Sequence, residues 1–396
     1  MTTRGSFSIT VAGMRSPVVL RSPITVLVVA AAAFGGVAVL WWLLGRPLGI
    51  DSAVYRAGGL AVLRGEPLYE HLSALPEWAS GLPFTYTPFA AMLFTPLAAL
   101  PIQLGWAVFA VAAAPAVFVT LRAFTIQKGL PLLVAGAFCL QPVWQTVGLG
   151  QINLILMAIV VVDVLVLRGS RYSGFGIGLA AAIKLIPLIF VVHLLVTGRR
   201  ADAGRALAAF AGATLLGLAV LPGDSVRFWT SAIFNDHFAA MKSWVGNQSW
   251  QGFLARTLPG AQWAIVLGVA LVGAATWFAV RRLHRAGDEH GALLVSAGCG
   301  LVVSPISWTH HWVWVVPAIG YLLTRRHTWM ALATAVLFTG WATAIVPGGG
   351  GREQGWNLAQ ALFGNAYLLA ALGAGAVLLV RHRSASRSPL RGLGVK

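Results

Sequence analysis

The sequence predicts an all-α integral membrane protein, a multi-span bundle of about 12 transmembrane helices, from three observations. Of its 396 residues, 58% are hydrophobic and only 10% are charged, whereas a soluble domain carries about 25% charged residues. Apolar runs of about 20 residues recur along the chain, long enough to cross a hydrocarbon core of about 30 Å. Basic and acidic residues also separate into alternate loops, as the positive-inside rule requires.

The expected spans follow the apolar runs in chain order. They cover about 24–45, 86–101, 104–121, 130–147, 150–168, 175–196, 207–222, 261–280, 292–306, 310–325, 329–346 and 361–380. The first run is too long for a cleavable signal peptide, and no A-x-A-like site closes it. We therefore expect a single integral-membrane domain over residues 1–396, with cytoplasmic tails at 1–23 and 381–396.

The charge pattern orients these spans. With the N-terminus inside, the inner segments hold 16 of the 28 basic residues, and seven of the 11 acids fall in outer loops. Two outer loops are long, at 46–85 and 223–260. The net charge of +17 thus reflects membrane topology, and we expect membrane lipids rather than nucleic acid as partners.

Two short outer loops break this rule. One carries Arg122 and Lys128, and the other carries Arg168 and Arg171. Either the span count in the first half of the chain is wrong, for example through a re-entrant pair, or these cations act on the outer side. The two cysteines lie far apart in apolar runs, so no disulfide framework is expected.

The first outer loop begins with an isolated carboxylate. The stretch "DSAVYRAGGLAVLRG" predicts a surface helix that ends at Gly65, with Asp51 and Tyr55 one turn apart on one face. A partly desolvated carboxylate at the membrane boundary can have its pKa raised enough to act as a base near neutrality. The alternative is that Asp51 caps this helix.

A lysine lies inside a predicted span. Lys184 is about nine residues into the run 175–196, and Pro187 follows it. Ionisable groups within the membrane are costly and usually functional, and a proline there favours a broken helix that lines a cavity. Gln151 and Asn153 open the preceding span, where amides either serve a site or bond to a neighbouring helix.

Two further clusters lie on the outer side. "SPISWTHHWVW" places His310 and His311 beside Trp308; these histidines either serve a site or hydrogen-bond at the headgroup level. In the second long loop, "GNQSWQGFLAR" has the side chains that sugar or phosphate recognition needs, although an ordinary polar loop would look similar. Its candidates are Asn247, Gln248, Trp250 and Arg256.

Several motifs are absent from the sequence. It contains no D-x-D pair, no G-x-x-x-x-G-K-[ST] phosphate loop and no H-E-x-x-H zinc motif. We therefore expect no use of ATP, of a nucleotide sugar on the inner face, or of zinc as a cofactor.

Six short patterns occur in one order between about residues 50 and 315. They are "D…Y…G…LY", "F-x-Y-x-P", "GQ-x-N", "K-x-x-P", "NQS-x-x-G" and "SP-x-SW-x-HH". In this order they resemble the polyprenol-phosphate-mannose-dependent mannosyltransferases of actinobacteria, glycosyltransferase family eighty-seven. The resemblance implies the multi-span GT-C fold in a bacterial cell membrane.

The resemblance also implies a reaction. It is an inverting transfer of mannose, on the periplasmic side, from polyprenyl-phosphate-mannose to a phosphatidylinositol-mannoside or related glycolipid acceptor, with an α-1,2 product. Asp51 would be the general base. Cations would stabilise the phosphate leaving group without a metal.

The remaining site residues follow from the same resemblance. His310 and His311 would belong to the catalytic site with their roles unassigned, and the donor phosphate would meet Lys184, Arg168, Arg171 or Arg122. The substrate-binding candidates are Tyr55, Arg64, Tyr69, Tyr86, Gln151, Asn153, Asn247, Gln248, Trp250, Arg256 and Trp308.

A lipid-linked-sugar flippase is the main alternative. A transporter gathers its polar groups at the membrane midplane, often in repeated halves. In this sequence the acids and histidines cluster in outer loops and no repeat is visible, which favours the transferase.

Overall fold

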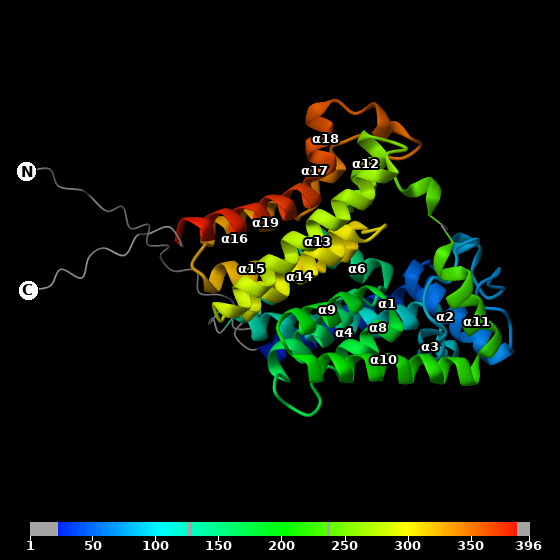
Figure 1. The fold of residues 1–396 in the computed structure, drawn as a ribbon. Coiled ribbons are helices and arrows are strands. Elements are labelled where there is room, and N and C mark those ends of the chain that lie inside the picture. The colour runs from blue at the N-terminus through cyan, green and yellow to red at the C-terminus, as the bar shows by residue number, and fades with distance from the viewer. Residues whose placement is uncertain (1–22, 126–128, 236–237, 386–396) are drawn as a thin grey trace, which may run out of the picture.

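The structure is a computed structural model that describes residues 23–125, 129–235 and 238–385. Within these ranges the chain is helical, without a named strand (Figure 1). Lys128, and the basic residues expected in the two terminal tails before residue 23 and after residue 385, lie outside the described ranges.

The first half of the chain contains eleven α-helices in the described residues. They are α1 (Pro23–Leu43), α2 (Ile50–Arg64), α3 (Pro88–Leu93), α4 (Ile102–Phe124), α5 (Leu130–Ala137), α6 (Gln141–Leu149), α7 (Asn153–Val161), α8 (Phe175–Ile183), α9 (Ile189–Val196), α10 (Arg200–Val220) and α11 (Pro222–Thr230). Shorter turns join them, including η3 (Thr95–Ala99), the π-helical η4 (Val162–Val166) and η5 (Ile186–Leu188).

The second half forms a second helical layer above the first (Figure 1). It comprises α12 (Trp250–Thr257), α13 (Gln262–Arg285), α14 (Glu289–Val303), η8 (Thr309–Trp314), α15 (Val315–Thr324), α16 (Thr328–Leu337), α17 (Trp341–Ala344), α18 (Leu358–Gly364) and α19 (Ala366–Ala385).

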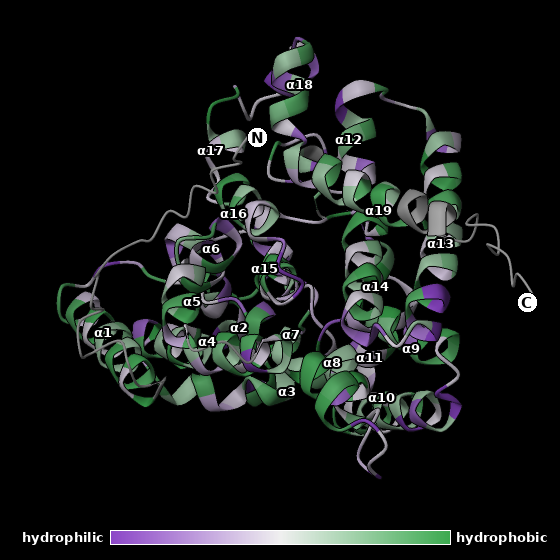
Figure 2. Ribbon diagram, turned by 90° about the vertical axis from the view of Figure 1, so that its left-hand side faces the viewer, coloured by the Kyte–Doolittle hydropathy of each residue, from purple (hydrophilic) through white to green (hydrophobic). Residues whose placement is uncertain are grey.

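The length and hydropathy of these helices agree with a membrane protein. Four described helices are long and apolar enough to cross a membrane: Ile24–Leu43, Ile102–Phe124, Arg200–Val220 and Gln262–Arg285. Two bent pairs, α5 with α6 and α18 with α19, raise the number to six. Apolar residues cover much of these helices in Figure 2. The expected number of 12 spans is not confirmed.

The predicted surface helix is confirmed. α2 ends at Gly65, which adopts the left-handed φ of 67° that favours glycine after a helix. The residue before the helix is Gly49, and the side chain of Asp51 makes no capping bond. The capping alternative for Asp51 is therefore wrong.

Residues 86–101 do not form the expected span. They fold into α3 and η3, and both ends of the segment contact α2: Tyr86 lies against Tyr55, and the Leu100 carbonyl accepts a hydrogen bond from Arg56 Nε at 2.7 Å. Prolines within the segment interrupt the helical hydrogen-bond ladder. Because the segment leaves and returns at one end of the molecule, α4 runs opposite to the expected direction.

This reversal places Arg122 and Arg168 at the end of the molecule opposite Asp51. The last turn of α4 carries Arg122, and the Phe124 carbonyl accepts a hydrogen bond from Thr324 Oγ1 at the end of α15. Arg168 pairs with Glu289 at 2.8 Å. We call the end of the molecule that holds Arg122, Arg168 and Arg199 the Arg199 end. The opposite end, which holds the first turn of α2, is the Asp51 end. The span count in the first half of the chain is therefore wrong: residues 86–101 return to the end where they began, and residues 175–196 form a hairpin rather than one crossing helix.

The predicted break at Lys184 is confirmed. α8 stops at Ile183, Lys184 is extended with φ −142° and ψ 127°, and α9 starts after η5. The two helices form a hairpin, because Ser173 before α8 and Arg199 after α9 are joined by a hydrogen bond of 2.8 Å. Lys184 therefore lies at the tip of the hairpin, away from the Arg199 end.

Candidate active site

Asp51, in the first turn of α2, lies at the centre of the polar cluster at the Asp51 end. Its Oδ2 accepts a hydrogen bond from Gln151 Nε2 at 2.9 Å, and Oδ1 has no hydrogen-bond partner among the described residues. The side chain is partly exposed. Burial raises the pKa of Asp51 to about 6, although the charge of Lys184 and the hydrogen bond from Gln151 oppose that rise. A carboxylate with one free oxygen and such a pKa suits a general base.

The orientation of the Gln151 amide is fixed by its surroundings. Its Oε1 faces three donors: the Tyr55 hydroxyl at 2.5 Å, the Tyr86 hydroxyl at 2.7 Å and the Ile152 N–H at 3.0 Å. The two hydroxyls are themselves 2.7 Å apart. With donors around the oxygen, the amide nitrogen must point to Asp51. Tyr55, Tyr86 and Gln151, which the sequence indicated only as substrate-binding candidates, therefore lie together at the Asp51 carboxylate.

Lys184 brings a positive charge to the same cluster. Its Nζ donates to Asn153 Oδ1 at 2.9 Å and lies 5.5 Å from the centroid of the Tyr86 ring. Asn153 in turn donates through Nδ2 to the His310 carbonyl at 3.1 Å. The tip of the hairpin between α8 and α9 thus places the Lys184 ammonium group against Asn153, the first residue of α7.

The two histidines border this charge. Their ring centroids are 4.7 Å apart with planes at 89°. The His310 carbonyl also accepts a hydrogen bond from Thr146 Oγ1 at 3.0 Å. Nδ1 of His311 is buried and has no partner within the described part of the chain. The histidines therefore belong to the cluster, and His311 retains an unused polar atom there.

Asn247 and Gln248, two candidates of the second long loop, make hydrogen bonds that stabilise the loop itself. Asn247 pairs with Trp308 in an isolated antiparallel bridge, and its Oδ1 accepts from the Ser307 and Ser249 N–H groups at 3.0 and 3.3 Å. Gln248 Nε2 donates to the Val245 and Gly364 carbonyls. These bonds hold the chain that leads from Trp308 to His310. The direct substrate contact expected of Asn247, Gln248 and Trp308 finds no support here.

The side chains of Arg256 and Trp250 also hydrogen-bond to backbone carbonyls. Arg256 donates to the Ser243, Trp244 and Asn247 carbonyls and to Asn365. The Trp250 indole donates to the Ala264 carbonyl at 3.0 Å. Neither side chain contacts the Asp51 cluster in the described structure. Their donor groups instead satisfy backbone carbonyls, which must be paired when they are buried.

Two candidates of the first loop lie farther along the chain from Asp51. Arg64 is 13 residues beyond Asp51 on α2, about 20 Å at helical rise, and its nearest acid is Glu66 at 3.7 Å. Tyr69 donates to the Tyr86 carbonyl at 2.8 Å and borders a separate pocket. Arg64 therefore does not belong to the cluster, and Tyr69 contacts it only through Tyr86.

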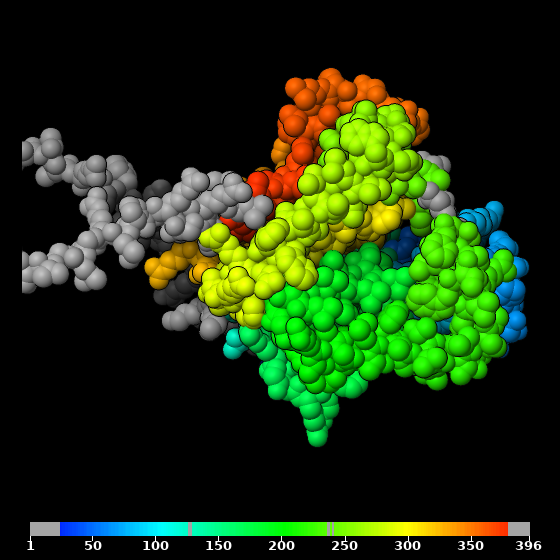
Figure 3. All heavy atoms as spheres, in the orientation of Figure 1, coloured from blue at the N-terminus to red at the C-terminus, as the bar shows by residue number. Residues whose placement is uncertain are grey.

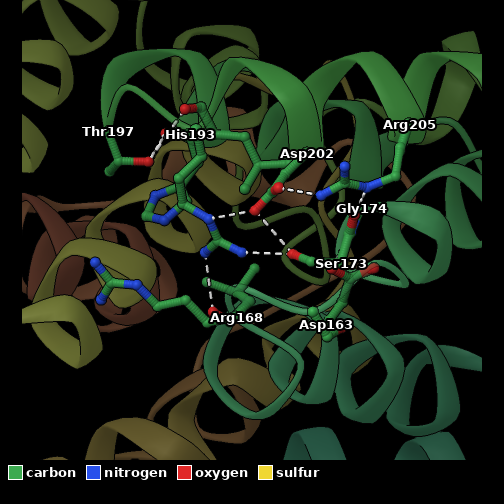
Figure 4. Close-up of polar contacts among 12 residues, drawn as sticks. Asp163, Arg168, Ser173, Gly174, His193, Thr197, Asp202 and Arg205 are labelled. Atoms are coloured by element: carbon green, nitrogen blue, oxygen red, sulfur yellow. Dashed lines mark hydrogen bonds and ion pairs between the residues drawn. The ribbon is translucent and has the colours of Figure 1, made fainter.

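The remaining cation candidates lie at the Arg199 end. Figure 4 shows Asp202 bound to Ser173 and Arg205, and Arg168 in the same view pairs with Glu289. Arg171 hydrogen-bonds the neighbouring Tyr172. Arg122 ends α4 on the same side. Arg122, Arg168 and Arg171, which were expected at the donor phosphate, therefore lie at the end of the molecule opposite Asp51. Among the described residues, Lys184 is the cation that reaches the cluster.

Sequence reasoning missed two polar residues. Thr146 holds the His310 carbonyl, and Asp163, the one acid within a predicted span, accepts from the Gly174 and Ile177 N–H groups at 2.6 and 3.0 Å. Asp163 thereby anchors the positive end of α8. Thr146 gave no signal because its partner is 164 residues away.

The chain resembles known proteins in sequence. The profile of glycosyltransferase family 87 matches residues 84–305. A polyprenol-phosphate-mannose-dependent alpha-(1-2)-phosphatidylinositol mannoside mannosyltransferase of Mycobacterium tuberculosis is 38% identical over 77% of both chains. Its namesake in Mycolicibacterium smegmatis is 33% identical over 83% of both chains. A pentamannoside mannosyltransferase of Mycolicibacterium smegmatis is 31% identical over 69% of both. No solved structure matches this chain significantly.

Proposed function

Since this chain belongs to glycosyltransferase family 87, we propose that it transfers mannose from polyprenyl-phosphate-mannose to a phosphatidylinositol-mannoside or related lipoglycan acceptor. The bond formed is an α-1,2 linkage, as the names of the similar proteins indicate. The observation that carries the proposal is the Asp51 carboxylate, which keeps Oδ1 free while Gln151 holds Oδ2.

The reaction is a single displacement at the anomeric carbon. An acceptor hydroxyl gives its proton to Asp51 Oδ1 while its oxygen attacks this carbon, and the bond from carbon to phosphate oxygen breaks. A β-linked donor therefore yields an α-linked product. The leaving group is polyprenyl phosphate, and the proton stays on Asp51 until solvent removes it. A base with a pKa of about 6 is ionised at neutral pH and ready for this step.

Lys184 stabilises the leaving phosphate. Its ammonium group has three N–H donors, and one is used by Asn153, so the other two can face phosphate oxygens. Fixed positive charge at a developing anion is an effective form of catalysis in a site of low dielectric. We expect this arrangement to work without a divalent metal.

The Asp51 end faces the periplasm in this proposal. The arginines cluster at the Arg199 end, where Arg168, Arg205 and Arg325 pair with acids, and basic residues favour the cytoplasmic side. Both termini are then cytoplasmic, and the protein resides in the bacterial cell membrane among membrane lipids. Nucleic acid plays no part.

A flippase without transferase activity is less compatible with this arrangement. The polar cluster is built from the loop after α1, the start of α7 and the loop before α15, all at one end of the molecule. A transporter would need its polar groups near the midplane to alternate access.

The decisive experiment is transfer of radiolabelled mannose from polyprenyl-phosphate-mannose to a phosphatidylinositol mannoside in the presence of EDTA. We expect activity in the wild type and its loss in Asp51→Asn, with donor binding retained. An active Asp51→Asn variant would move the base elsewhere. No transfer by the wild type would favour the flippase.

A further inference from the structure

The first long loop carries a pocket that the proposed mechanism does not use. It has a volume of about 330 Å³ and lies between two short runs, residues 69–71 and 81–84. Small-molecule sites have volumes of about 300–1,000 Å³. In Figure 3 the light-blue part of the chain that holds these runs lies at the edge of the molecule, beside green α11. The pocket is therefore accessible from outside the helical bundle.

The lining of the pocket combines aromatic faces with free polar groups. The rings of Tyr69 and Phe84 have centroids 6.2 Å apart and planes at 52°. Glu70 and His71 are exposed beside them. Glu70 pairs with Arg227 through Oε1, and neither Glu70 Oε2 nor His71 has a hydrogen bond to another described side chain. Apolar walls with a few polar groups are typical of small-ligand sites, and a carboxylate with an imidazole can bind hydroxyl groups.

The pocket is connected to the catalytic cluster through α2 and Tyr86. Phe84 packs on Gly58 so closely that a Cβ at Gly58 would lie 2.4 Å from the ring. Gly58 follows Asp51 by seven residues, which is about 10 Å along the helix. On the other side, the Tyr69 hydroxyl donates to the Tyr86 carbonyl at 2.8 Å. A ligand in the pocket would thus lie a short and fixed distance from the Asp51 carboxylate.

We infer that this pocket binds an inner sugar of the acceptor glycan while the terminal sugar offers its hydroxyl to Asp51. The inference rests on the proposed function, and it names the ligand as a mannosyl unit of an oligomannoside. A phosphate does not fit, because the Glu70 carboxylate would repel it and Arg227 is already paired. A lipid chain does not fit either, because the Glu70 carboxylate and the His71 imidazole line the pocket.

Kinetics with two acceptors tests this subsite. For a phosphatidylinositol mannoside with four mannoses, His71→Ala should raise KM about 3- to 10-fold, the effect of losing one hydrogen bond, with kcat unchanged. An acceptor with two mannoses should show no change, since it does not extend to the pocket. His327→Ala, an exposed histidine at the start of α16, is the matched control. An unchanged KM, or an equal rise for both acceptors, would overturn the inference.

A second pair of variants separates sugar contact from the ion pair. Glu70→Gln and Arg227→Gln each remove the exposed pair between Glu70 and Arg227, but only Glu70 lines the pocket. We expect Glu70→Gln to raise the KM of the four-mannose acceptor and Arg227→Gln to leave it unchanged. Equal effects would assign Glu70 to the ion pair and overturn its contact with the sugar.

Direct binding distinguishes failure of this inference from failure of the proposed function. Saturation-transfer NMR with a methyl α-mannotrioside should show binding to the wild type and weaker binding to His71→Ala. If the wild type transfers mannose but trisaccharide binding is unaffected by both His71→Ala and Glu70→Gln, the subsite is wrong and the function stands. If the wild type transfers to no mannoside and binds no trisaccharide, both are wrong.

Discussion

Gln151 Nε2 donates a hydrogen bond to Asp51 Oδ2 at 2.9 Å, although the two residues are 100 positions apart in the chain. The bond joins the first turn of the surface helix α2 to the residue before α7. Because Tyr55, Tyr86 and the Ile152 N–H surround the other end of the amide, Gln151 can only donate to the carboxylate. The remaining carboxylate oxygen is then free for the acceptor hydroxyl.

Asp51→Asn should abolish most of the transfer without unfolding the protein. Loss of a general base typically lowers the rate about 10²- to 10⁴-fold, and asparagine keeps the size of the side chain. Initial rates at saturating donor and acceptor measure the effect. Glu77→Gln, an exposed acid in the same loop, is the control and should remain active. Comparable losses in both variants would argue against a special role for Asp51.

The rate should depend on pH through Asp51. Burial raises the pKa of this carboxyl to about 6, so the base is protonated below that pH and ionised above it. We expect kcat/KM to fall about tenfold per pH unit below 6 and to level off above it. The hydrogen bond from Gln151 lowers the pKa of Asp51, so Gln151→Met should move the inflection to higher pH. An unshifted profile in that variant would contradict the role of Gln151.

Tyr55 and Tyr86 should act together on the Gln151 amide. Either Tyr55→Phe or Tyr86→Phe leaves a hydroxyl and the Ile152 N–H on Gln151 Oε1, so each single change should lower kcat only modestly. In the double variant only the Ile152 N–H remains on Gln151 Oε1, so the amide is held less firmly against Asp51. A double-mutant cycle on kcat should therefore show a coupling of about 0.5–3 kcal/mol. Additive losses would mean that the tyrosines do not orient the amide.

Lys184 should be needed for departure of the phosphate, and Arg168 should not. Lys184→Met removes the only positive side chain that the structure brings to the cluster within its described residues, and we expect kcat to fall about 10²-fold or more. Arg168→Met should retain transfer, since its half-exposed pair with Glu289 contributes only about 0–1 kcal/mol to stability. The reverse order of effects would restore Arg168 as the phosphate ligand.

Asn247→Ala should destabilise the protein rather than weaken substrate binding. Asn247 is fully buried and its Oδ1 accepts two backbone N–H groups, so alanine leaves these donors unpaired at a cost of about 1–3 kcal/mol. Thermal unfolding in detergent should shift to lower temperature while the acceptor KM of the folded enzyme is unchanged. A raised KM at unchanged stability would return Asn247 to the substrate site.

Much of the site could be predicted because its residues carry local signals. A lone carboxylate followed by a helix that ends at Gly65, and a lysine before a proline in an apolar run, stand out in a chain with 10% charged residues. The structure confirms α2 and the break at Lys184. For Asn247 and Arg256 the sequence could not choose between a loop-building and a sugar-binding role, because a polar side chain that satisfies backbone groups has the same composition as one that binds a sugar.

The sequence by itself determined the membrane class and the surface helix α2, and it singled out Asp51 and Lys184, because hydropathy, helix termini and isolated charges are local properties. Only the tertiary structure decided the direction of α4 and the side on which Arg122 and Arg168 lie. A segment such as 86–101 has the composition of a span, yet its prolines and its packing on α2 return it to the end where it began. Hydropathy reports the preference of a segment for an apolar environment, and lipid and a protein interior both provide one.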